Sequence, residues 1–298
     1  MTADPEHNGR PVLIGVDGGG TGCRAAVADL QLRRLGEGTG GPANFTTDPQ
    51  TCLRNLRAVI DAAGADAGLS AMEIAQATVH AGIAGIMTPA DARDAAEALP
   101  FARVDVTDDR PTMMAGALGA RDGLLAAIGT GSFVGLQRCA ERRFFGGYGL
   151  QVGDQASGSW LGRAALERTL LAHDGLAGSS GLTAALLARF GGDAVAVSVF
   201  AYGASPAEFA EFAPMVLEGA ESGDPVASAL MAEGAAYLRR VIVAAGLAAE
   251  DVICLAGGIG PHYASRLAPE DRNRLRAPQG TALDGALFLA RALHAACP

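Results

Sequence analysis

The chain has 298 residues, with 23 basic and 32 acidic side chains, so its formal net charge is −9. Every basic residue is arginine. The lack of lysine excludes a Walker A phosphate loop, a protein-kinase active site and Schiff-base catalysis, because each needs a lysine amine. The acidic balance argues against nucleic acid or an anionic membrane as a partner. Length and a 49% hydrophobic composition predict a globular protein of one or two domains.

Cysteine spacing and the first residues indicate the compartment. The five cysteines are too far apart for a metal or iron–sulfur motif, and their odd number argues against a disulfide framework. The opening residues MTADPEHNGR lack the apolar core of a signal peptide, and no apolar stretch suits a membrane span. We therefore expect a soluble cytoplasmic protein with no membrane partner, and a disordered tail over residues 1–11.

The first half of the chain alternates between strand and helix patterns. Apolar runs predict strands over residues 12–17, 23–30, 77–83 and 102–106. Helical periodicity and capping residues predict helices over 48–63, 70–76, 89–99 and 111–120, with Gly64 ending the first of them. The segment 31–47 is predicted to be a loop.

The second half becomes mostly helical. Strands are predicted over 124–128, 133–138 and 252–255, with a glycine-rich loop over 144–155. Helices are predicted over 160–173, 181–190, 205–218, 225–246 and 281–295, the first of them capped by Ser157 or Ser159.

A strand–turn–strand pattern occurs twice, about 110 residues apart. VLIGVDGGGTGCRAAVADL and LLAAIGTGSFVGLQ each join two apolar strands through a glycine–threonine turn. Such a duplication predicts two similar domains facing a cleft, although a repeated structural turn without a ligand is the alternative.

Both turns suit phosphate. In the first, Gly18, Gly19 and Gly20 let backbone N–H groups approach an anion, and Thr21 adds a hydroxyl donor. Asp17 can hold Mg²⁺ directly or through water. In the second, the same chemistry comes from Gly129, Thr130, Gly131 and Ser132. Together the turns can hold a polyphosphate without a lysine, whereas plain hairpin turns are the alternative.

A pair of acids follows a predicted strand. Ligand sites in α/β sheets lie beyond the carboxyl ends of strands, where Asp108 and Asp109 stand. A carboxylate there can accept the proton of a hydroxyl that attacks phosphorus. Asp109, just before Arg110 and Pro111, equally suits a helix cap.

Two further glycine-rich segments are candidates for ligand binding. The loop GGYGLQVGDQASGSW (146–160) offers Tyr148, Asp154 and Gln155, which suit sugar hydroxyls, although Asp154 can instead cap the next helix. AGGIG at 256–260 follows a strand and suits close approach to a flat base, and a turn without a ligand fits equally well. The five scattered histidines fit structural or surface roles.

Taken in order, these motifs resemble those of a known family. VDGGGT, Asn44, TDD with AGALG, AIGTGS, the 146–160 loop, AGGIG and LDGALFLA look like the N-acetylglucosamine kinase and dehydratase-activator ATPase family of the sugar kinase/actin/heat-shock superfold. The resemblance runs from about Val12 to Ala290. It implies an α/β fold of two similar ribonuclease-H-like domains, with mixed sheets flanked by helices and an ATP cleft between them.

The resemblance also implies a domain division and residue roles. Residues 1–118, joined by the terminal helix 281–298, would form the phosphate-1 and sugar domain, and 119–280 the phosphate-2 and adenosine domain. Asp109 matches the catalytic aspartate. The implied sugar contacts are Asn44, Asp109, Gly147, Tyr148 and Asp154, with Gln155 beside the sugar. The implied ATP contacts are Gly18–Thr21, Gly129–Ser132, Ala210, Gly257 and Gly258.

The resemblance implies an ATP- and Mg²⁺-dependent amino-sugar kinase, with N-acetylglucosamine and its 6-hydroxyl as the first candidate. Tyr148 stands where animal enzymes have tryptophan, and Gln155 where many relatives have glutamate, which removes a charge beside the sugar. The dehydratase-activator branch is disfavoured because its paired cluster-binding cysteines are absent. A kinase for glucosamine or another amino sugar, and a non-catalytic nucleotide- or sugar-responsive regulator, are the alternatives. The superfold often dimerises, which leaves a homodimer open.

Overall fold

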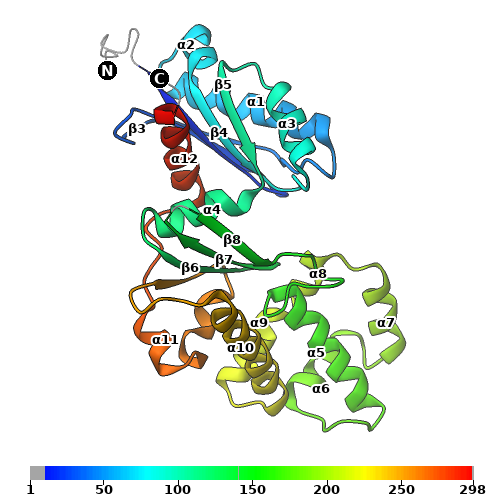
Figure 1. Cartoon of the computed structure of the whole chain (residues 1–298). Coiled ribbons are helices and arrows are strands. Elements are labelled where there is room, and N and C mark those ends of the chain that lie inside the picture. The colour runs from blue at the N-terminus through cyan, green and yellow to red at the C-terminus, as the bar shows by residue number, and fades with distance from the viewer. Residues whose placement is uncertain (1–10, 140, 297–298) are drawn as a thin grey trace. The chain divides into compact units, whose positions relative to one another are not determined.

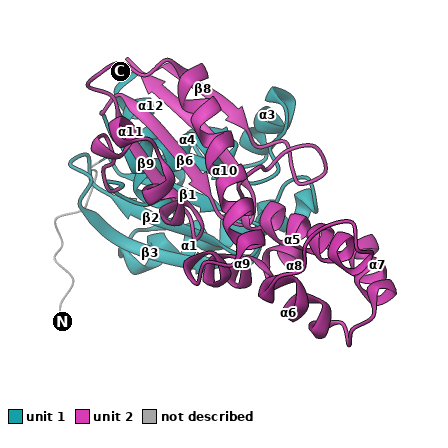
Figure 2. Ribbon diagram, turned by 90° about the horizontal axis from the view of Figure 1, so that it is seen from below, with its two compact units in different colours: residues 1–120, 278–298 teal, residues 121–277 magenta. Residues whose placement is uncertain are grey.

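The computed structural model describes residues 11–139 and 141–296, so the tail expected at 1–11 lies outside the described residues except for Pro11. The chain divides into two compact units (Figures 1 and 2). Unit 1 contains residues up to 120 together with those from 278 onward, and unit 2 contains residues 121–277. The functional division into a sugar domain and an adenosine domain remains a prediction.

Unit 1 is a five-stranded mixed sheet with helices. Its strands are β1 (Leu13–Gly18), β2 (Cys23–Ala28), β3 (Arg34–Gly40), β4 (Thr78–Ile83) and β5 (Arg103–Thr107). Its helices are α1 (Pro49–Asp66), α2 (Ala71–Gln76), α3 (Pro89–Glu97), α4 (Asp109–Leu118) and α12 (Ala282–Ala296). The strand order is β3-β2-β1-β4-β5, in which β1, β2 and β3 pair antiparallel and β4 and β5 run parallel to β1.

The two faces of this sheet are covered by different parts of the chain. Because side chains alternate along a strand, Ile14 and Val16 of β1 join the core formed with α1, whereas Leu13 joins a core with Leu283 and Leu287 of α12. The last helix of the chain therefore completes the first unit.

The loop predicted over 31–47 is wrong in part, because β3 occupies Arg34–Gly40. Its sequence, RLGEGTG, has three glycines and only one β-branched residue, Thr39, whereas strands are typically rich in β-branched residues. A Cβ on Gly36 would lie 2.4 Å from the Ala67 amide nitrogen, and one on Gly38 would lie 2.6 Å from the Val59 carbonyl oxygen. These glycines let α1 pack directly on the backbone of the edge strand.

Two predicted helix boundaries in unit 1 also need correction. Gly64 does not end the first helix, since α1 continues to Asp66. The helix expected from Pro111 begins at Asp109, two residues earlier. The predicted capping of α3 is confirmed, because the Thr88 side chain accepts a hydrogen bond from the Asp91 backbone N–H and the Asp91 side chain accepts from that of Thr88.

Unit 2 combines a four-stranded mixed sheet with a helical region. Its strands are β6 (Gly123–Ile128), β7 (Ser132–Arg138), β8 (Glu141–Gly146) and β9 (Val252–Ala256). Its helices are α5 (Gly158–His173), α6 (Gly181–Arg189), α7 (Ala194–Gly203), α8 (Pro206–Ala210), α9 (Ala213–Glu221), α10 (Pro225–Ala245), the 3₁₀ helix η2 (Gly260–Arg266) and α11 (Pro269–Asn273). The strand order β8-β7-β6-β9 repeats β3-β2-β1-β4, with the same antiparallel and parallel pairings. The strand–turn–strand repeat in the sequence is therefore confirmed.

Several predictions for unit 2 are corrected. The start of the loop expected over 144–155 belongs to strand β8, and helix α7 was not predicted. The helix expected over 205–218 is two helices, α8 and α9, separated at residues 211–212. Helices η2 and α11 follow β9 where no element was predicted.

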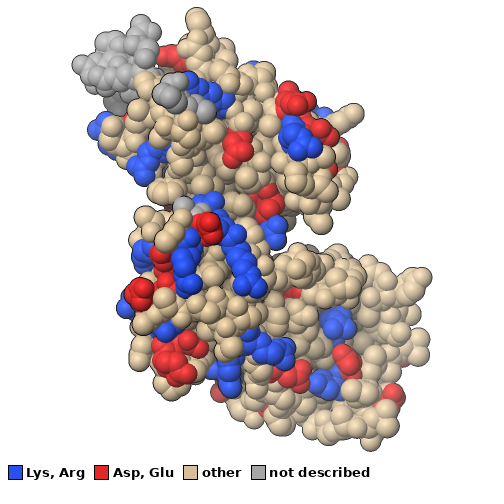
Figure 3. All heavy atoms as spheres, in the orientation of Figure 1, with Lys and Arg blue, Asp and Glu red and all other residues tan. Residues whose placement is uncertain are grey.

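The core and surface of unit 2 follow from the same patterning. Leu124, Ala126 and Ile128 of β6 join one apolar cluster with Leu161 of α5 and Leu238 of α10. No described helix is by itself long and apolar enough to cross a membrane; only the bent pair α6 and α7, taken together, has the length and composition for it. On the face shown in Figure 3, arginine and acidic side chains are interspersed over both units.

Candidate active site

The turn between β1 and β2 is held by backbone hydrogen bonds and has an open tip. The Gly19 N–H donates to the Gly22 carbonyl over 2.9 Å, and the Gly19 carbonyl accepts from Ala43 over 2.8 Å. Gly20 and Thr21 are exposed, and the Thr21 hydroxyl has no hydrogen-bond partner among the described residues. The turn therefore offers a rigid base and a free hydroxyl donor, as an anion site requires.

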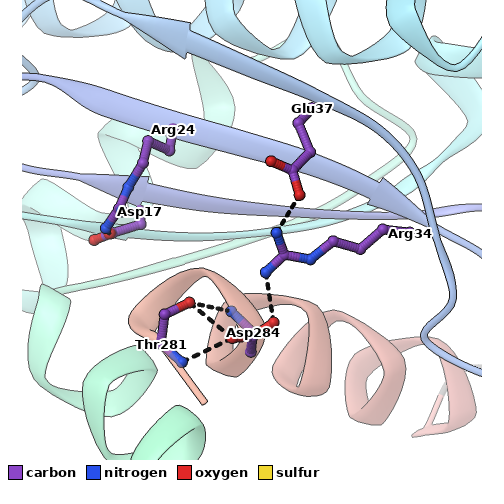
Figure 4. A network of polar contacts seen from close by, with 6 residues as sticks. All are labelled: Asp17, Arg24, Arg34, Glu37, Thr281 and Asp284. Atoms are coloured by element: carbon purple, nitrogen blue, oxygen red, sulfur yellow. Dashed lines mark hydrogen bonds and ion pairs between the residues drawn. The ribbon is translucent and has the colours of Figure 1, made fainter.

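Asp17 lies at the end of β1, directly before this turn. It pairs in register with Arg24 of β2, and the Arg24 guanidinium contacts one Asp17 carboxylate oxygen over 2.6 Å (Figure 4). The Asp17 side chain is 18% exposed. Mg²⁺ binds through one or two carboxylates and keeps several waters, so the second oxygen of Asp17 fits such an ion. No group of three potential metal ligands occurs among the described residues.

Asp108 and Asp109, which follow β5, make different contacts. The Asp108 side chain caps α4, accepting from the Arg110 backbone N–H over 2.9 Å and from the Arg110 guanidinium over 2.7 Å. The alternative that Asp109 is the cap is therefore wrong. Within the described part of the chain, the half-buried Asp109 carboxylate has no ion pair, and its one hydrogen bond is accepted from its own backbone N–H. Its uncommitted oxygens are available to a ligand.

The surroundings of Asp109 suit a proton acceptor. Burial raises the pKa of Asp109 above its ordinary value of 3.8, and the negative charges of Asp108 and Asp17 raise it further. Its own backbone N–H and Arg110 lower the pKa in part. A carboxylate with a raised pKa is a stronger base in its ionised form.

A buried histidine supports the turn before α4. His80 of β4 contacts the Asp105 carboxylate through Nδ1 over 2.9 Å and the Thr107 hydroxyl through Nε2 over 3.4 Å. The Thr107 hydroxyl donates to the Asp108 carbonyl over 2.8 Å. This chain of contacts links the sheet to the backbone beside Asp109, which fits the structural role expected for His80.

Asn44 lies in the loop after β3 and is half-buried. Its Oδ1 accepts from the Thr47 backbone N–H over 3.0 Å and from the Thr47 hydroxyl over 3.1 Å. Because a backbone N–H can only donate, the oxygen faces Thr47 and the amide nitrogen faces away. That nitrogen has no partner among the described residues and can donate to a ligand.

In unit 2, the turn at Gly129–Ser132 is fixed by the start of α5. The Gly158 N–H donates to the Gly129 carbonyl over 2.8 Å, and the Ser159 N–H to the Thr130 carbonyl over 3.0 Å. The Thr130 side chain is exposed, with no hydroxyl partner within the described ranges. As in unit 1, a backbone-anchored turn presents a free threonine hydroxyl.

Asp154 joins this turn to the glycine-rich loop. Its buried carboxylate accepts from the backbone N–H groups of Ser132 and Gly149, which lower its pKa in part, whereas burial raises the pKa above 3.8. Its φ of 55° is left-handed. Ser157 caps α5, so the alternative that Asp154 caps that helix is wrong.

The glycine-rich loop displays an aromatic side chain. Gly146, Gly147 and Gly149 all have left-handed φ, and Tyr148 between them is 73% exposed. The Gln155 backbone carbonyl accepts a hydrogen bond from the Ser132 hydroxyl over 2.7 Å. The side-chain amide of Gln155 is half-buried and has no partner among the described residues. Tyr237 of α10 also contacts this loop at Gly146, and no local motif in the sequence signals that contact.

The expected adenosine loop packs on the phosphate turn of the same unit. A Cβ on Gly257 would lie 2.2 Å from the Ile128 carbonyl oxygen and 3.0 Å from the Gly129 amide nitrogen. Gly258 has open space around it, and Ala210 lies against Gly158 at the start of α5.

The structure thus gathers the expected residues into two sets, one in each unit. In unit 1, Asp17, the 18–21 turn and Asp109 lie together at strand ends, since the charge of Asp17 acts on Asp109. In unit 2, the 129–132 turn is in contact with Asp154, α5 and the 256–260 loop. The contacts made by the Gly158 and Ser159 amides were not predicted, because they depend on where α5 begins.

Comparison with known proteins identifies the relatives of this architecture. A family model described as the BadF/BadG/BcrA/BcrD ATPase family matches residues 14–271. The Vibrio cholerae protein named glucosamine kinase GspK is 29% identical over 282 residues, which cover 93% of this chain and 95% of that protein.

Solved structures agree with this match. A protein from Chromobacterium violaceum, provisionally named N-acetylglucosamine kinase, is 35% identical with a TM-score of 0.84, and the match covers 94% of this chain and 99% of that one. A ROK family glucokinase from Streptomyces griseus, in complex with glucose and AMPPNP, is 19% identical with a TM-score of 0.56 over 94% of this chain and 98% of that one. This second likeness concerns the fold alone. The expected α/β sugar-kinase fold with two mixed sheets flanked by helices is confirmed.

Proposed function

This chain belongs to the BadF/BadG/BcrA/BcrD ATPase family, and on that premise we propose that it is an ATP-dependent amino-sugar kinase. In the proposed reaction the 6-hydroxyl oxygen of N-acetylglucosamine attacks the γ-phosphorus of ATP. The bond from that phosphorus to the β–γ bridging oxygen breaks, which releases ADP, and the hydroxyl proton goes to the enzyme. The products are N-acetylglucosamine 6-phosphate and ADP.

The observation that carries the proposal is the state of Asp109. Its carboxylate is half-buried, is not used for capping or ion pairing among the described residues, and has a raised pKa. These are the properties of a general base that accepts a hydroxyl proton. Asp108 caps the helix and holds Arg110, which leaves the neighbouring carboxylate free for chemistry.

The glycine turns supply the phosphate chemistry that lysine supplies in other kinases. The Thr21 and Thr130 hydroxyls and the adjoining backbone amides donate to phosphate oxygens. Asp17 would hold Mg²⁺, which when bound spreads the charge of the phosphates. In unit 2, Gly257 and Gly258 leave a bare backbone surface suited to the adenosine, with Ala210 as a further contact.

In unit 1 the expected sugar contact is Asn44, and in unit 2 the expected sugar contacts belong to the 146–160 loop. The Asn44 amide nitrogen donates to a sugar oxygen, and Gly147, Tyr148 and Asp154 contribute the loop that faces the sugar. Gln155 is neutral, so it suits an uncharged acetamido group, whereas a free ammonium would gain from a carboxylate at that position. This difference makes N-acetylglucosamine the first candidate.

Glucosamine is the second candidate, and one observation favours it. The V. cholerae relative, which matches nearly the whole chain, is named as a glucosamine kinase. The two candidates differ only at the 2-amino group, so one assay can compare them directly.

The test is a coupled assay of ADP release over a panel of sugars. N-acetylglucosamine, glucosamine, glucose and mannose are each supplied with ATP and Mg²⁺, and the phosphorylated carbon is identified by NMR. We expect the highest kcat/KM with N-acetylglucosamine and phosphate on O6. The matched control is 6-deoxy-N-acetylglucosamine, which has no acceptor hydroxyl and should bind without turnover. Sugar binding without ADP release for every member of the panel would indicate a regulator and contradict the proposal.

A further inference from the structure

We propose that Tyr237 is an additional sugar-binding residue, whose phenol hydroxyl hydrogen-bonds to the sugar beside the 146–149 loop. The inference rests on the proposed function, because it extends the same sugar site. Tyr237 lies on α10, about ninety residues along the chain from that loop, and the residues that carry the inference all belong to unit 2.

The Tyr237 hydroxyl lies against the glycine-rich loop. A Cβ on Gly146 would lie 2.7 Å from the Tyr237 hydroxyl oxygen, so the phenol reaches the backbone where the loop turns. Gly146 has a φ of 71°, and the left-handed φ of Gly147 continues the turn toward Tyr148. The loop that presents the expected sugar contacts is thus in direct contact with the Tyr237 hydroxyl.

This hydroxyl is available to a ligand. Tyr237 is half-buried, and its hydroxyl has no hydrogen-bond partner among the described residues. No fully buried side-chain nitrogen or oxygen in the described ranges lacks a partner, so the unpaired Tyr237 hydroxyl must be open to solvent or ligand. Tyr263 provides a contrast, because its fully buried hydroxyl donates to the Ala156 carbonyl over 2.9 Å.

Burial and the nearby charge of Asp154 favour the neutral form of the Tyr237 phenol. Burial raises the pKa of Tyr237 above 10.0, the negative charge of Asp154 and the Tyr148 phenol raise it further, and Arg240 lowers it in part. The phenol therefore carries its proton at neutral pH and can both donate and accept. A sugar hydroxyl needs such a partner, since it also donates and accepts.

The test compares Tyr237→Phe with the matched control Tyr202→Phe in the full chain. Tyr202 lies on α7 and is 98% exposed, so its hydroxyl should affect no kinetic constant. Phe at 237 keeps the ring and removes only the hydroxyl. Loss of one neutral hydrogen bond should raise the KM for N-acetylglucosamine about 3- to 10-fold, while the KM for ATP stays within about twofold.

Two outcomes overturn the role of Tyr237 while wild-type turnover still supports the kinase. One is a sugar KM within about twofold of wild type in Tyr237→Phe. The other is an equal rise of both KM values, which would indicate a general disturbance of unit 2. Absence of sugar turnover in the wild type would instead overturn the proposed function, and the role of Tyr237 with it.

Discussion

Two neighbouring carboxylates, Asp108 and Asp109, show how position alone separates structural from chemical roles. Asp108 precedes α4 and accepts a hydrogen bond from the Arg110 N–H in the first turn of the helix, whereas Asp109 is already helical and its side chain has no ion pair among the described residues. The charge of Asp108 nevertheless acts on its neighbour and raises the pKa of Asp109. The cap therefore also tunes the proposed base.

Replacing Asp108 by Asn tests this coupling. Asn retains the capping preference and removes the negative charge, so the pKa of Asp109 should fall. The base acts only when ionised, so activity is lost as pH falls through its pKa. The acid limb of kcat/KM should therefore move to lower pH in Asp108→Asn, as measured by initial rates across the acid range. A limb that stays in place or moves to higher pH contradicts the coupling.

The sequence could place the acid pair at the end of a strand but could not divide its tasks. Either residue can cap a helix that contains Pro111, and only the helix start at Asp109 decides between them. The role of Tyr237 was even less predictable from the sequence. Its contact with Gly146 depends on how α10 packs, and no local sequence motif indicates it.

The turns are the elements on which the site depends, and the 256–260 loop packs closely against the 129–132 turn. Gly257 has a φ of 81° and space only for hydrogen where its backbone meets Ile128. Gly258, one residue later, has no left-handed φ, and a Cβ added there would have no neighbouring atom within 4 Å. Adjacent glycines therefore differ in what they tolerate.

Gly257→Ala and Gly258→Ala form a matched pair for this packing. We expect Gly257→Ala to lower the free energy of unfolding by about 1–3 kcal/mol, from backbone strain alone, and by more if the turn shifts. Gly258→Ala should change it by less than about 0.5 kcal/mol. Urea unfolding followed by circular dichroism measures both. Equal effects of the two substitutions would show that the turn and the loop do not pack as described.

Among the secondary-structure elements, the sequence predicted apolar strands and capped helices, but it did not predict elements whose formation depends on tertiary contacts. Strands β1, β4 and β6 are mostly apolar and buried, and Thr88 marks the start of α3. Strand β3 has too little strand propensity to be recognised, because its glycines serve the approach of α1. The residues that require these glycines, at the end of α1, are about thirty positions further along the chain.

The last helix of the chain, α12, packs on the sheet formed by the first part of the chain. Helix α12 packs on β1 and β2 through apolar side chains, and Arg34 of β3 links Asp284 of α12 to Glu37 (Figure 4). Arg34 and both acids are partly exposed, so these ion pairs contribute little, and the apolar contact carries most of the stabilisation.

Leu287→Ala tests how much α12 contributes to unit 1. Leu287 is 2% exposed, so its truncation should lower the free energy of unfolding by about 2–4 kcal/mol. The control is Leu176→Ala, at a leucine that is 75% exposed, for which we expect a change below about 0.5 kcal/mol. Both are measured by urea denaturation, and a similar small effect at the two positions would contradict the packing of α12.

The duplicated strand–turn–strand pattern was the sequence feature that predicted most about the whole molecule. It indicated two sheets of one plan, and the orders β3-β2-β1-β4 and β8-β7-β6-β9 confirm it. Helical periodicity could not predict that α12 belongs to unit 1, because an amphipathic helix pattern does not specify which sheet the helix covers. That expectation came from the family resemblance.

Asp109→Asn tests whether Asp109 is the general base of an amino-sugar kinase. Because the folded state raises the pKa of Asp109, ionisation at neutral pH opposes folding, so the neutral variant should be at least as stable as the wild type. We predict that sugar-dependent ADP release falls about 10²- to 10⁴-fold while the variant remains folded. Turnover close to that of the wild type would show that Asp109 is not the general base.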